Sequence, residues 1–193
     1  MVRITDLHQG IVYGTQTALT KKHDDLINKF YYDGDNGTVL NRFIMQAAVE
    51  HPLTIHGRGG QTRAFIHLRD SLQCIRMALE NPPEKGDRVK IFNQAAQTLN
   101  INDLALKIYK KTGCELRYYK NPRNEDAANE LRLCNEGFKS LGWKPIMLDD
   151  VLVEEIYEIA MKYKHRCDMD KIICTSTWRN DMDIDLEGSE TKK

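Results

Sequence analysis

Short apolar segments alternate along this chain with stretches in which apolar residues recur every three or four positions. The short segments are typical of strands, and the longer period is typical of amphipathic helices. Strands that alternate with helices pack together as α/β layers. The sequence therefore predicts an α/β fold. The apolar segments are residues 2–7, 10–14, 53–56, 62–68, 88–92 and 115–119.

Capping residues mark the expected ends of the helices. Thr38 is placed to open one helix, and Asp70 is expected to cap a second helix that reaches about residue 80. Asn100, with Asp103 three positions later, has the form of a capping box. Gly113 suits the left-handed conformation that ends many helices.

Two further helices are expected at residues 125–140 and 150–165, and the chain contains no internal repeat. We expect residues 1–180 to form one substrate-binding part and residues 181–193 to form a polar tail that frays at its end.

Charge and cysteine content argue against several classes of protein. The 28 basic and 28 acidic residues cancel, which argues against bulk attraction to nucleic acid or to an anionic membrane. No apolar run approaches the roughly 20 residues of a spanning helix. The five cysteines form no CxxC pair and predict neither a zinc site nor a disulfide framework. Their number is odd and they are widely spread, as expected for ordinary thiols in a reducing compartment, so we expect a cytoplasmic protein. No apolar segment typical of a signal peptide follows Met1.

Three segments are candidates for holding a diphosphate. The first, residues 37–42, places a glycine ahead of a helix start, where backbone N–H groups and the helix dipole favour an anion. The second, residues 56–63, combines glycines, which let backbone approach a ligand, with Arg63. The third is residues 121–123, which end in Arg123. Taken singly, the first is more simply explained as a capped helix and the third as a surface loop, and the second can also be a glycine-rich hairpin with a solvated arginine.

In this order the segments resemble the extended short-chain dehydrogenase/reductase family that acts on nucleotide sugars. Residues 10–14 and 53–70 are similar to its substrate half, and residues 139–145, KSLGWKP, resemble a late family signature. The resemblance implies the end of a Rossmann-type sheet plus a small α/β substrate-binding lobe. It also implies NAD as cofactor and a UDP-hexose as ligand.

A narrower likeness is to the branch of that family that adds a sulfite-derived sulfonate to UDP-glucose, and it covers roughly residues 2–180. That branch oxidises the sugar transiently with bound NAD, so the resemblance implies UDP-glucose and a sulfite donor as partners. The similar segments are residues 5–14, 37–43, 51–63, 89–94, 121–123 and 176–178.

The resemblance assigns roles to individual residues. Gln9 matches a position near the nicotinamide end of NAD, and Arg63 and Arg123 match the arginines that neutralise the diphosphate. The family more often has Tyr where this chain has His56, and Gln61 is a weaker candidate. The remaining substrate-binding candidates are Val39, Leu40, Asn41 and Arg42 beside the diphosphate, Ile55, His56 and Gly57 beside the uracil, and Asn121 and Pro122.

Two family motifs do not occur in this chain. No GxGxxG or GxxGxxG cradles a dinucleotide, and no Tyr has a Lys four positions later. The resemblance places Met1 just after the Tyr/Lys helix, so we expect the chain to start inside the fold. It therefore predicts no catalytic residue here, and an NAD domain supplied by a separate N-terminal chain or by upstream sequence.

Other functions stay open. The chain could serve a nucleotide-sugar epimerase or dehydratase, a UDP-sugar-binding module without catalysis, or a general α/β interaction protein. Without a covering domain, the strands near Ile4 and Phe65 are expected to expose edges or apolar faces, which favours self-association into a homo-oligomer.

Overall fold

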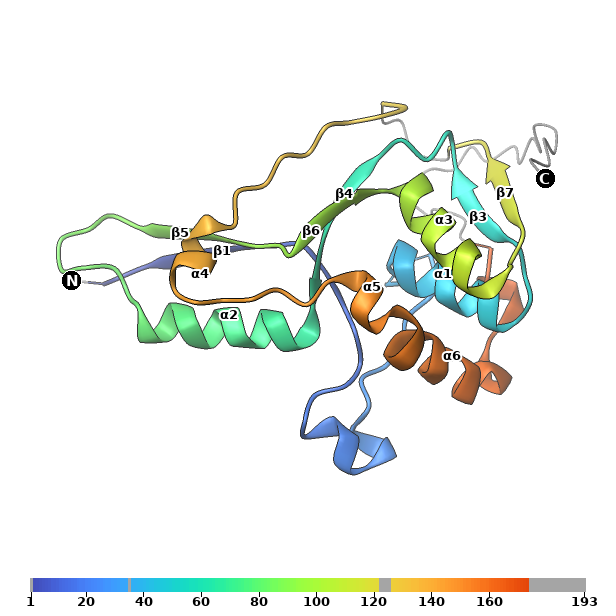
Figure 1. Ribbon diagram of the computed structural model, residues 1–193, viewed down its shortest axis with the longest axis horizontal. Coiled ribbons are helices and arrows are strands. Elements are labelled where there is room, and N and C mark those ends of the chain that lie inside the picture. The colour runs from blue at the N-terminus through green and yellow to red at the C-terminus, as the bar shows by residue number, and fades with distance from the viewer. Residues whose placement is uncertain (1, 35, 122–125, 174–193) are drawn as a thin grey trace. The chain divides into compact units, whose positions relative to one another are not determined.

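The computed structural model describes residues 2–34, 36–121 and 126–173, and it consists of two compact units (Figure 1). Both units combine helices with parallel strands, which confirms the predicted α/β class. The division between residues 1–180 and 181–193 stays a prediction, because the tail lies outside the described residues. Unit 1 comprises Met1–Asn28, Arg63–Thr98 and Leu131–Leu152, and unit 2 comprises Lys29–Thr62, Leu99–Glu130 and Val153–Lys193.

Unit 1 contains two sets of parallel strands. Strand β1 (Thr5–Gln9) pairs in parallel with β5 (Lys90–Gln94). Strand β2 (Ile11–Tyr13) pairs in parallel with β4 (Thr62–His67), and β6 (Gln97–Asn100) is the other neighbour of β4. Strands β4 and β6 run from one unit into the other, because residues 62, 99 and 100 belong to unit 2.

The core of unit 1 lies between its strands, α2 (Leu68–Glu80) and α4 (Glu136–Ser140). The Phe92 ring of β5 stacks on the Phe138 ring of α4 at 4.4 Å between centroids, and Trp143 meets Phe138 edge-on at 6.0 Å. Trp143 is buried, so at least part of the KSLGWKP segment packs the core. The other buried members of this core are Ile66, Cys74, Met77 and Ala78.

Unit 2 contains the third parallel pair of strands, in which β3 (Leu53–His56) pairs with β7 (Leu116–Tyr119). Helices α1 (Val39–Ala48) and α3 (Ile101–Thr112) pack on β3 and on each other, and α6 (Glu158–Tyr163) packs on α1. Leu40, Phe43, Ile44, Leu53, Ile55, Leu104, Ile108 and Ile156 are all fully or almost fully buried.

Short helical turns complete the described chain. The polar residues after β2 contain the 3₁₀ turns η1 (Thr20–Lys22) and η2 (Asp24–Leu26). The predicted helix at 150–165 is confirmed, but it is formed by consecutive short segments. One of them is π-helical, with hydrogen bonds between residues five apart. The segments are α5 (Leu148–Val151), the π-helical η3 (Leu152–Tyr157), α6 and η4 (Lys164–Arg166), and η5 (Met169–Lys171) follows.

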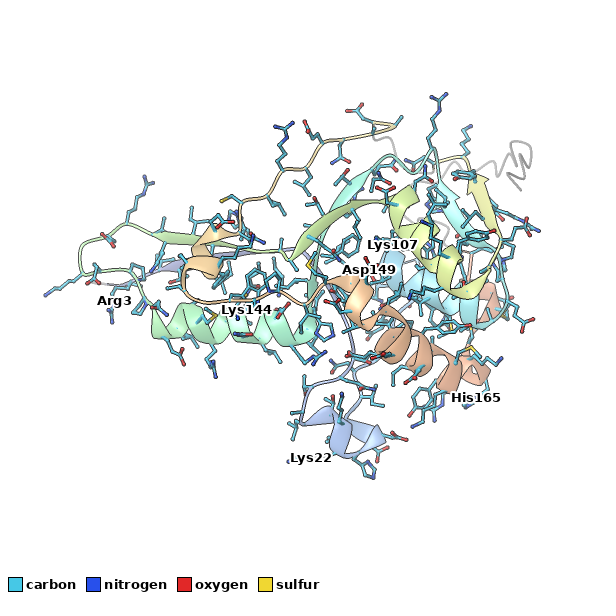
Figure 2. All side chains as sticks on the ribbon, in the orientation of Figure 1. Arg3, Lys22, Lys107, Lys144, Asp149 and His165 are labelled. Atoms are coloured by element: carbon cyan, nitrogen blue, oxygen red, sulfur yellow. The ribbon has the colours of Figure 1, made fainter. Side chains whose placement is uncertain are left out.

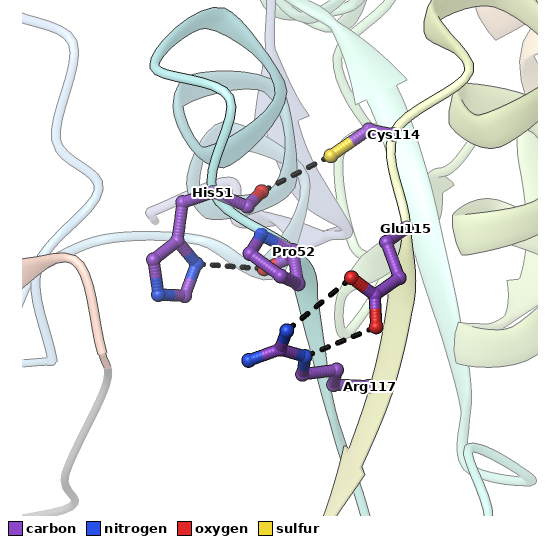
Figure 3. Close-up of polar contacts among 5 residues, drawn as sticks. All are labelled: His51, Pro52, Cys114, Glu115 and Arg117. Atoms are coloured by element: carbon purple, nitrogen blue, oxygen red, sulfur yellow. Dashed lines mark hydrogen bonds and ion pairs between the residues drawn. The ribbon is translucent and has the colours of Figure 1, made fainter. Parts of the chain in front are cut away.

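At the amino ends of β3 and β7, the Leu53 amide donates to the Glu115 carbonyl at 2.8 Å, in keeping with the register of the two strands. Figure 3 shows the side-chain contacts around this point. The Cys114 thiol donates to the His51 carbonyl at 3.0 Å, and the Arg117 guanidinium donates to both carboxylate oxygens of Glu115 at 3.1 and 3.3 Å. The carboxylate raises the pKa of Arg117. Register fixed here also fixes which residues face each other at the carboxyl ends, since His56 pairs with Tyr119.

Two predictions about secondary structure are wrong. Asp70 does not cap α2, because His67 is the cap residue and its ring accepts the Arg69 amide at 3.1 Å. Of the helix expected at residues 125–140, only α4 forms, and residues 126–135 are not helical. That segment is instead held by contacts to strands, such as the Asn93 side chain of β5 donating to the Cys134 carbonyl at 2.8 Å.

The exposed fractions of Ile4 and Phe65 show whether the strands near them expose apolar faces, as the sequence predicts. Ile4 is 52% exposed, as predicted, whereas Phe65 is fully buried, so the exposed face expected there is absent. Charged side chains such as Arg3, Lys22 and His165 project into solvent (Figure 2). Within the described ranges, no helix has the length and apolar content needed to cross a membrane.

Candidate functional site

The start of α1 is formed as predicted. Thr38 is the cap residue, and its hydroxyl accepts the Asn41 amide at 3.3 Å. The amides of Val39 and Leu40 occupy the first turn, where a helix supplies no internal acceptor. The segment therefore presents free backbone donors at the positive end of a ten-residue helix, a chemistry suited to an anion.

The carboxyl end of β3 lies at the same end of unit 2 as the start of α1. The chain reverses direction between α1 and β3, as shown by the hydrogen bonds that the side chain of Gln46, late in α1, forms with Thr54, early in β3. A short helix and a strand that pack this way run in opposite directions. Ligand sites in α/β folds commonly lie at the carboxyl ends of parallel strands.

Gly57 and Asn121 meet at this end. The Gly57 amide donates to the Tyr119 carbonyl at 2.7 Å, so the β3–β7 pairing continues one residue beyond the strands. A Cβ added to Gly57 would lie 3.4 Å from Asn121 Cβ, and Gly57 has φ +62°. Two predicted site segments, far apart in sequence, are thus adjacent. Pro122 and Arg123 lie outside the described residues.

The glycine-rich loop from His56 to Gln61, called here the glycine loop, is anchored on two sides. The amides of Ile101 and Asn102, in the first turn of α3, donate to the carbonyls of Gln61 and Gly59 at 3.0 and 2.9 Å. On the other side, Gly60 forms a bridge with Ala128. The loop is therefore a fixed part of unit 2, and the hairpin interpretation of this segment is wrong.

Burial limits how some predicted residues can contact a ligand. The side chains of Leu40 and Ile55 are fully buried in the core, so only their backbone is available. Arg42 is 7% exposed, and its guanidinium carbon lies 5.5 Å from the Phe43 ring centre. Val39, Asn41 and His56 are half-buried and keep surface for contact.

Gln9 and Arg63 belong to unit 1. Gln9 lies at the carboxyl end of β1, paired with Gln94 of β5, and its side-chain amide donates to the Ser71 hydroxyl at 2.6 Å. Arg63 lies half-buried on β4. The Ser71 contact leaves the Gln9 carbonyl oxygen as the end that can accept a hydrogen bond from a ligand.

This end of unit 2 offers groups that can bind a ligand. It offers backbone amides, glycines and the carboxamide of Asn121. In the described part of the chain, no group of three His, Cys, Asp or Glu side chains is arranged to hold a metal ion. Sequence reasoning missed Asn102, which holds the glycine loop, because a polar residue in the first turn of a helix gives no sign of its partner.

The family comparison matches the region that contains α1, β3 and the glycine loop. Residues 27–94 match the model of the NAD dependent epimerase/dehydratase family.

Two curated relatives match most of the chain. The chloroplastic UDP-sulfoquinovose synthase of Spinacia oleracea is 39% identical over 92% of this chain and 38% of its own length. The UDP-sulfoquinovose synthase of Sulfolobus acidocaldarius is 35% identical over 91% of this chain and 46% of its own length. The chain thus spans less than half the length of these relatives. Since the spinach protein is named as chloroplastic, the cytoplasmic location stays a prediction.

Solved structures share the fold at lower identity. A UDP-glucuronic acid 4-epimerase variant from Bacillus cereus, bound to a fluorinated UDP-sugar and NAD, has a TM-score of 0.60 at 23% identity, over 83% of this chain and 46% of its own. The UDP-glucose 4-epimerase of Thermotoga maritima, bound to UDP-glucose, has a TM-score of 0.59 at 22% identity, over 86% and 47%. Part of this chain, residues 27–94, is thus similar to the NAD dependent epimerase/dehydratase family, and most of the chain is similar to the UDP-sulfoquinovose synthases.

Proposed function

We propose that this chain is the substrate-binding part of a UDP-sulfoquinovose synthase-like enzyme. Its ligand is UDP-glucose or a related UDP-hexose, and the reaction it serves adds a sulfite-derived sulfonate to the sugar. The identity of 39% over 92% of the chain carries this proposal. The start of α1 and the glycine loop, at one end of unit 2, support it as the nucleotide-binding elements.

The diphosphate is assigned to backbone donors and arginines. The first turn of α1 offers the amides of Val39 and Leu40, with Asn41 and Arg42 as the neighbouring candidates. Arg63 and Arg123 are assigned as guanidinium groups whose planar shape matches phosphate oxygens. Ile55, His56 and Gly57 are assigned to the uracil. Asn121, which lies beside Gly57, and Pro122 are further candidates.

Gln9 is the one residue of this chain that we assign to the cofactor. Its side chain is fixed by Ser71 at 2.6 Å, so it is pre-oriented for a carboxamide such as that of nicotinamide. NAD, when bound, supplies the reversible hydride acceptor for the sugar. The pyrophosphate cradle and the acid–base residues are assigned to sequence outside this chain, since the GxGxxG and Tyr/Lys motifs do not occur in it.

Calorimetric titration of the chain with UDP and UDP-glucose tests the binding part. Arg63→Ala and Arg123→Ala are each expected to weaken binding roughly ten- to hundredfold, since a charged hydrogen bond contributes about 1.5–3 kcal/mol. Arg88→Ala is the matched control: Arg88 is an exposed arginine outside the segments assigned to the nucleotide, and its loss should leave affinity unchanged. A folded chain that binds neither ligand contradicts the proposal.

The reaction is tested with the complete enzyme, encoded with the DNA upstream of Met1 or by a neighbouring gene. A sulfonated product that forms from UDP-glucose only when sulfite is present supports the sulfonate-transferring function. An epimer or 4-keto sugar formed without sulfite instead assigns the chain to a nucleotide-sugar epimerase or dehydratase.

A further inference from the structure

Asn102 contacts the glycine loop with both its backbone and its side chain. Its backbone amide donates to the Gly59 carbonyl at 2.9 Å, and its side-chain amide donates to the Arg58 carbonyl at 2.8 Å. Its side-chain oxygen accepts the Tyr118 hydroxyl at 3.0 Å. One residue of α3 therefore ties the loop after β3 to strand β7.

These partners require the carboxamide of asparagine. The nitrogen faces a carbonyl and must donate, while the oxygen faces a hydroxyl that donates to it. An aspartate keeps the acceptor for Tyr118 but places negative charge against the Arg58 carbonyl. The pairing also fixes the orientation of the carboxamide, because the reverse orientation would face the Arg58 carbonyl with an oxygen.

The fit between Asn102 and the loop is tight at Gly59. This residue has φ +69°, and a Cβ built on it would lie 2.7 Å from the Asn102 side-chain oxygen and 3.0 Å from Ile55 Cγ2. Glycine is thus required both for its backbone conformation and for space. The loop backbone rests directly on the Asn102 carboxamide, two residues from Gly57.

We propose that Asn102 is a positioning residue of the nucleotide site, with Tyr118 as its support. By holding the carbonyls of residues 58 and 59, it sets the backbone at Gly57, which borders the assigned uracil position. This inference rests on the proposed function. A loop fixed before the ligand arrives loses less conformational entropy on binding, so the clamp raises affinity without touching the nucleotide.

The test compares UDP affinity with thermal stability in variants of the full 193-residue chain. Asn102→Ala and Asn102→Asp are expected to weaken UDP binding about tenfold, and Tyr118→Phe about threefold, as expected for the loss of one or two neutral hydrogen bonds. In the same variants, amide hydrogen exchange of residues 57–61 should accelerate. Tyr118→Phe is the milder variant, and it decides the question if the Asn102 variants do not fold.

Two control variants separate positioning from general stability. Thr112→Val removes the hydrogen bonds to the Ile108 carbonyl and from the Cys114 amide at the far end of α3, and should lower the melting temperature without changing affinity. Tyr109→Phe matches Tyr118→Phe, since the two tyrosines are 45% and 43% exposed, but the Tyr109 hydroxyl has no hydrogen bond within the described ranges.

The outcomes distinguish the two proposals. If the wild-type chain binds UDP and the Asn102 and Tyr118 variants bind it equally well, the positioning role is wrong while the proposed function stands. If the folded wild-type chain does not bind UDP, the proposed function is wrong, and this role of Asn102 is wrong with it.

Discussion

The carboxylate of Asp70 accepts a 2.7 Å hydrogen bond from the backbone amide of Ile146, a residue 76 positions later in the chain. Asp70 is 1% exposed in the first turn of α2. Burial, which disfavours the charged form, raises the pKa of Asp70 above its ordinary value of 3.8, and the hydrogen bond from Ile146 opposes this. Nearby His67 and Arg69 also lower it.

This pKa predicts how stability depends on pH. A carboxyl group with a raised pKa binds a proton more tightly in the folded state, so its contribution is complete below pH 3.8 and is lost as pH rises through the raised pKa. Asp70→Asn keeps an acceptor for Ile146 and cannot ionise. Urea unfolding at pH 4 and pH 7 should therefore show the variant gaining stability relative to wild type as pH rises. An equal difference at both pH values would contradict this.

Replacing Gln46 should lower the free energy of unfolding by a large amount. Its fully buried side chain donates to the Thr54 hydroxyl and the Ile172 carbonyl, and accepts the Thr54 amide. Gln46→Ala leaves these buried groups unpaired and should cost about 2–4 kcal/mol. Thr54→Val, which removes only the hydroxyl, should cost about 1 kcal/mol. Chemical denaturation measures both, and equal losses would show that the contacts of Gln46 with the Ile172 carbonyl and the Thr54 amide contribute nothing.

Gly59 and Asn102 should be energetically coupled. Gly59→Ala introduces both a strained φ and a close contact, whereas Gly113→Ala introduces only the strained φ, since nothing lies within 4 Å of its Cβ position. The Gly113 variant should lose about 1–2 kcal/mol, and the Gly59 variant more. In an Asn102→Ala background, the Gly59→Ala cost should fall by about 0.5–1 kcal/mol. Additive losses in this double-mutant cycle would show that the two residues do not press on each other.

The cysteines should differ in reactivity. Burial raises the pKa of Cys74 to about 12, so at pH 8 only about one thiol in ten thousand is the reactive thiolate. Cys134 is exposed. Iodoacetamide labelling followed by peptide mass spectrometry should modify Cys134 in the native protein and Cys74 only after unfolding. Early labelling of Cys74 would mean that unit 1 opens locally.

The open face of β1 and β5 should promote self-association. Ile4 and Ile91 are 52% and 55% exposed, and a parallel pair of strands normally has both faces covered. Ile91→Lys should lower the apparent mass measured by sedimentation at micromolar concentration. Leu79→Lys is the control, because Leu79 is 76% exposed on α2, away from this face. A wild-type chain that stays monomeric would contradict the prediction.

Local signals in the sequence located much of the fold. Thr38, Asn100 and Gly113 cap helices as predicted, because caps depend on residues within one turn. Asp70 does not cap α2 as its sequence context predicts, because its carboxylate accepts the amide of Ile146, which is remote in sequence. The helix expected at 125–140 failed for the same reason, since long-range contacts hold residues 126–135 to strands and override helix propensity.

In the candidate site too, some features can be predicted from local sequence and others depend on long-range packing. The helix start at Thr38 follows from local pattern, and the adjacency of Gly57 and Asn121 is consistent with both segments following parallel strands. Burial of the Leu40 and Ile55 side chains, and the role of Asn102, depend on tertiary packing that periodicity does not encode. The assignments of Gln9, Arg63 and Arg123 came from family resemblance and stay predictions.

The hydrogen bond between Gln46 and Ile172 spans 126 residues and has a consequence for protein synthesis. At roughly 5–20 residues per second, on the order of ten seconds pass between translation of the two residues. During that interval α1 and β3 can form, but the buried carboxamide lacks one of its partners. Unit 2 therefore cannot complete its core on the ribosome until nearly the whole described chain has emerged.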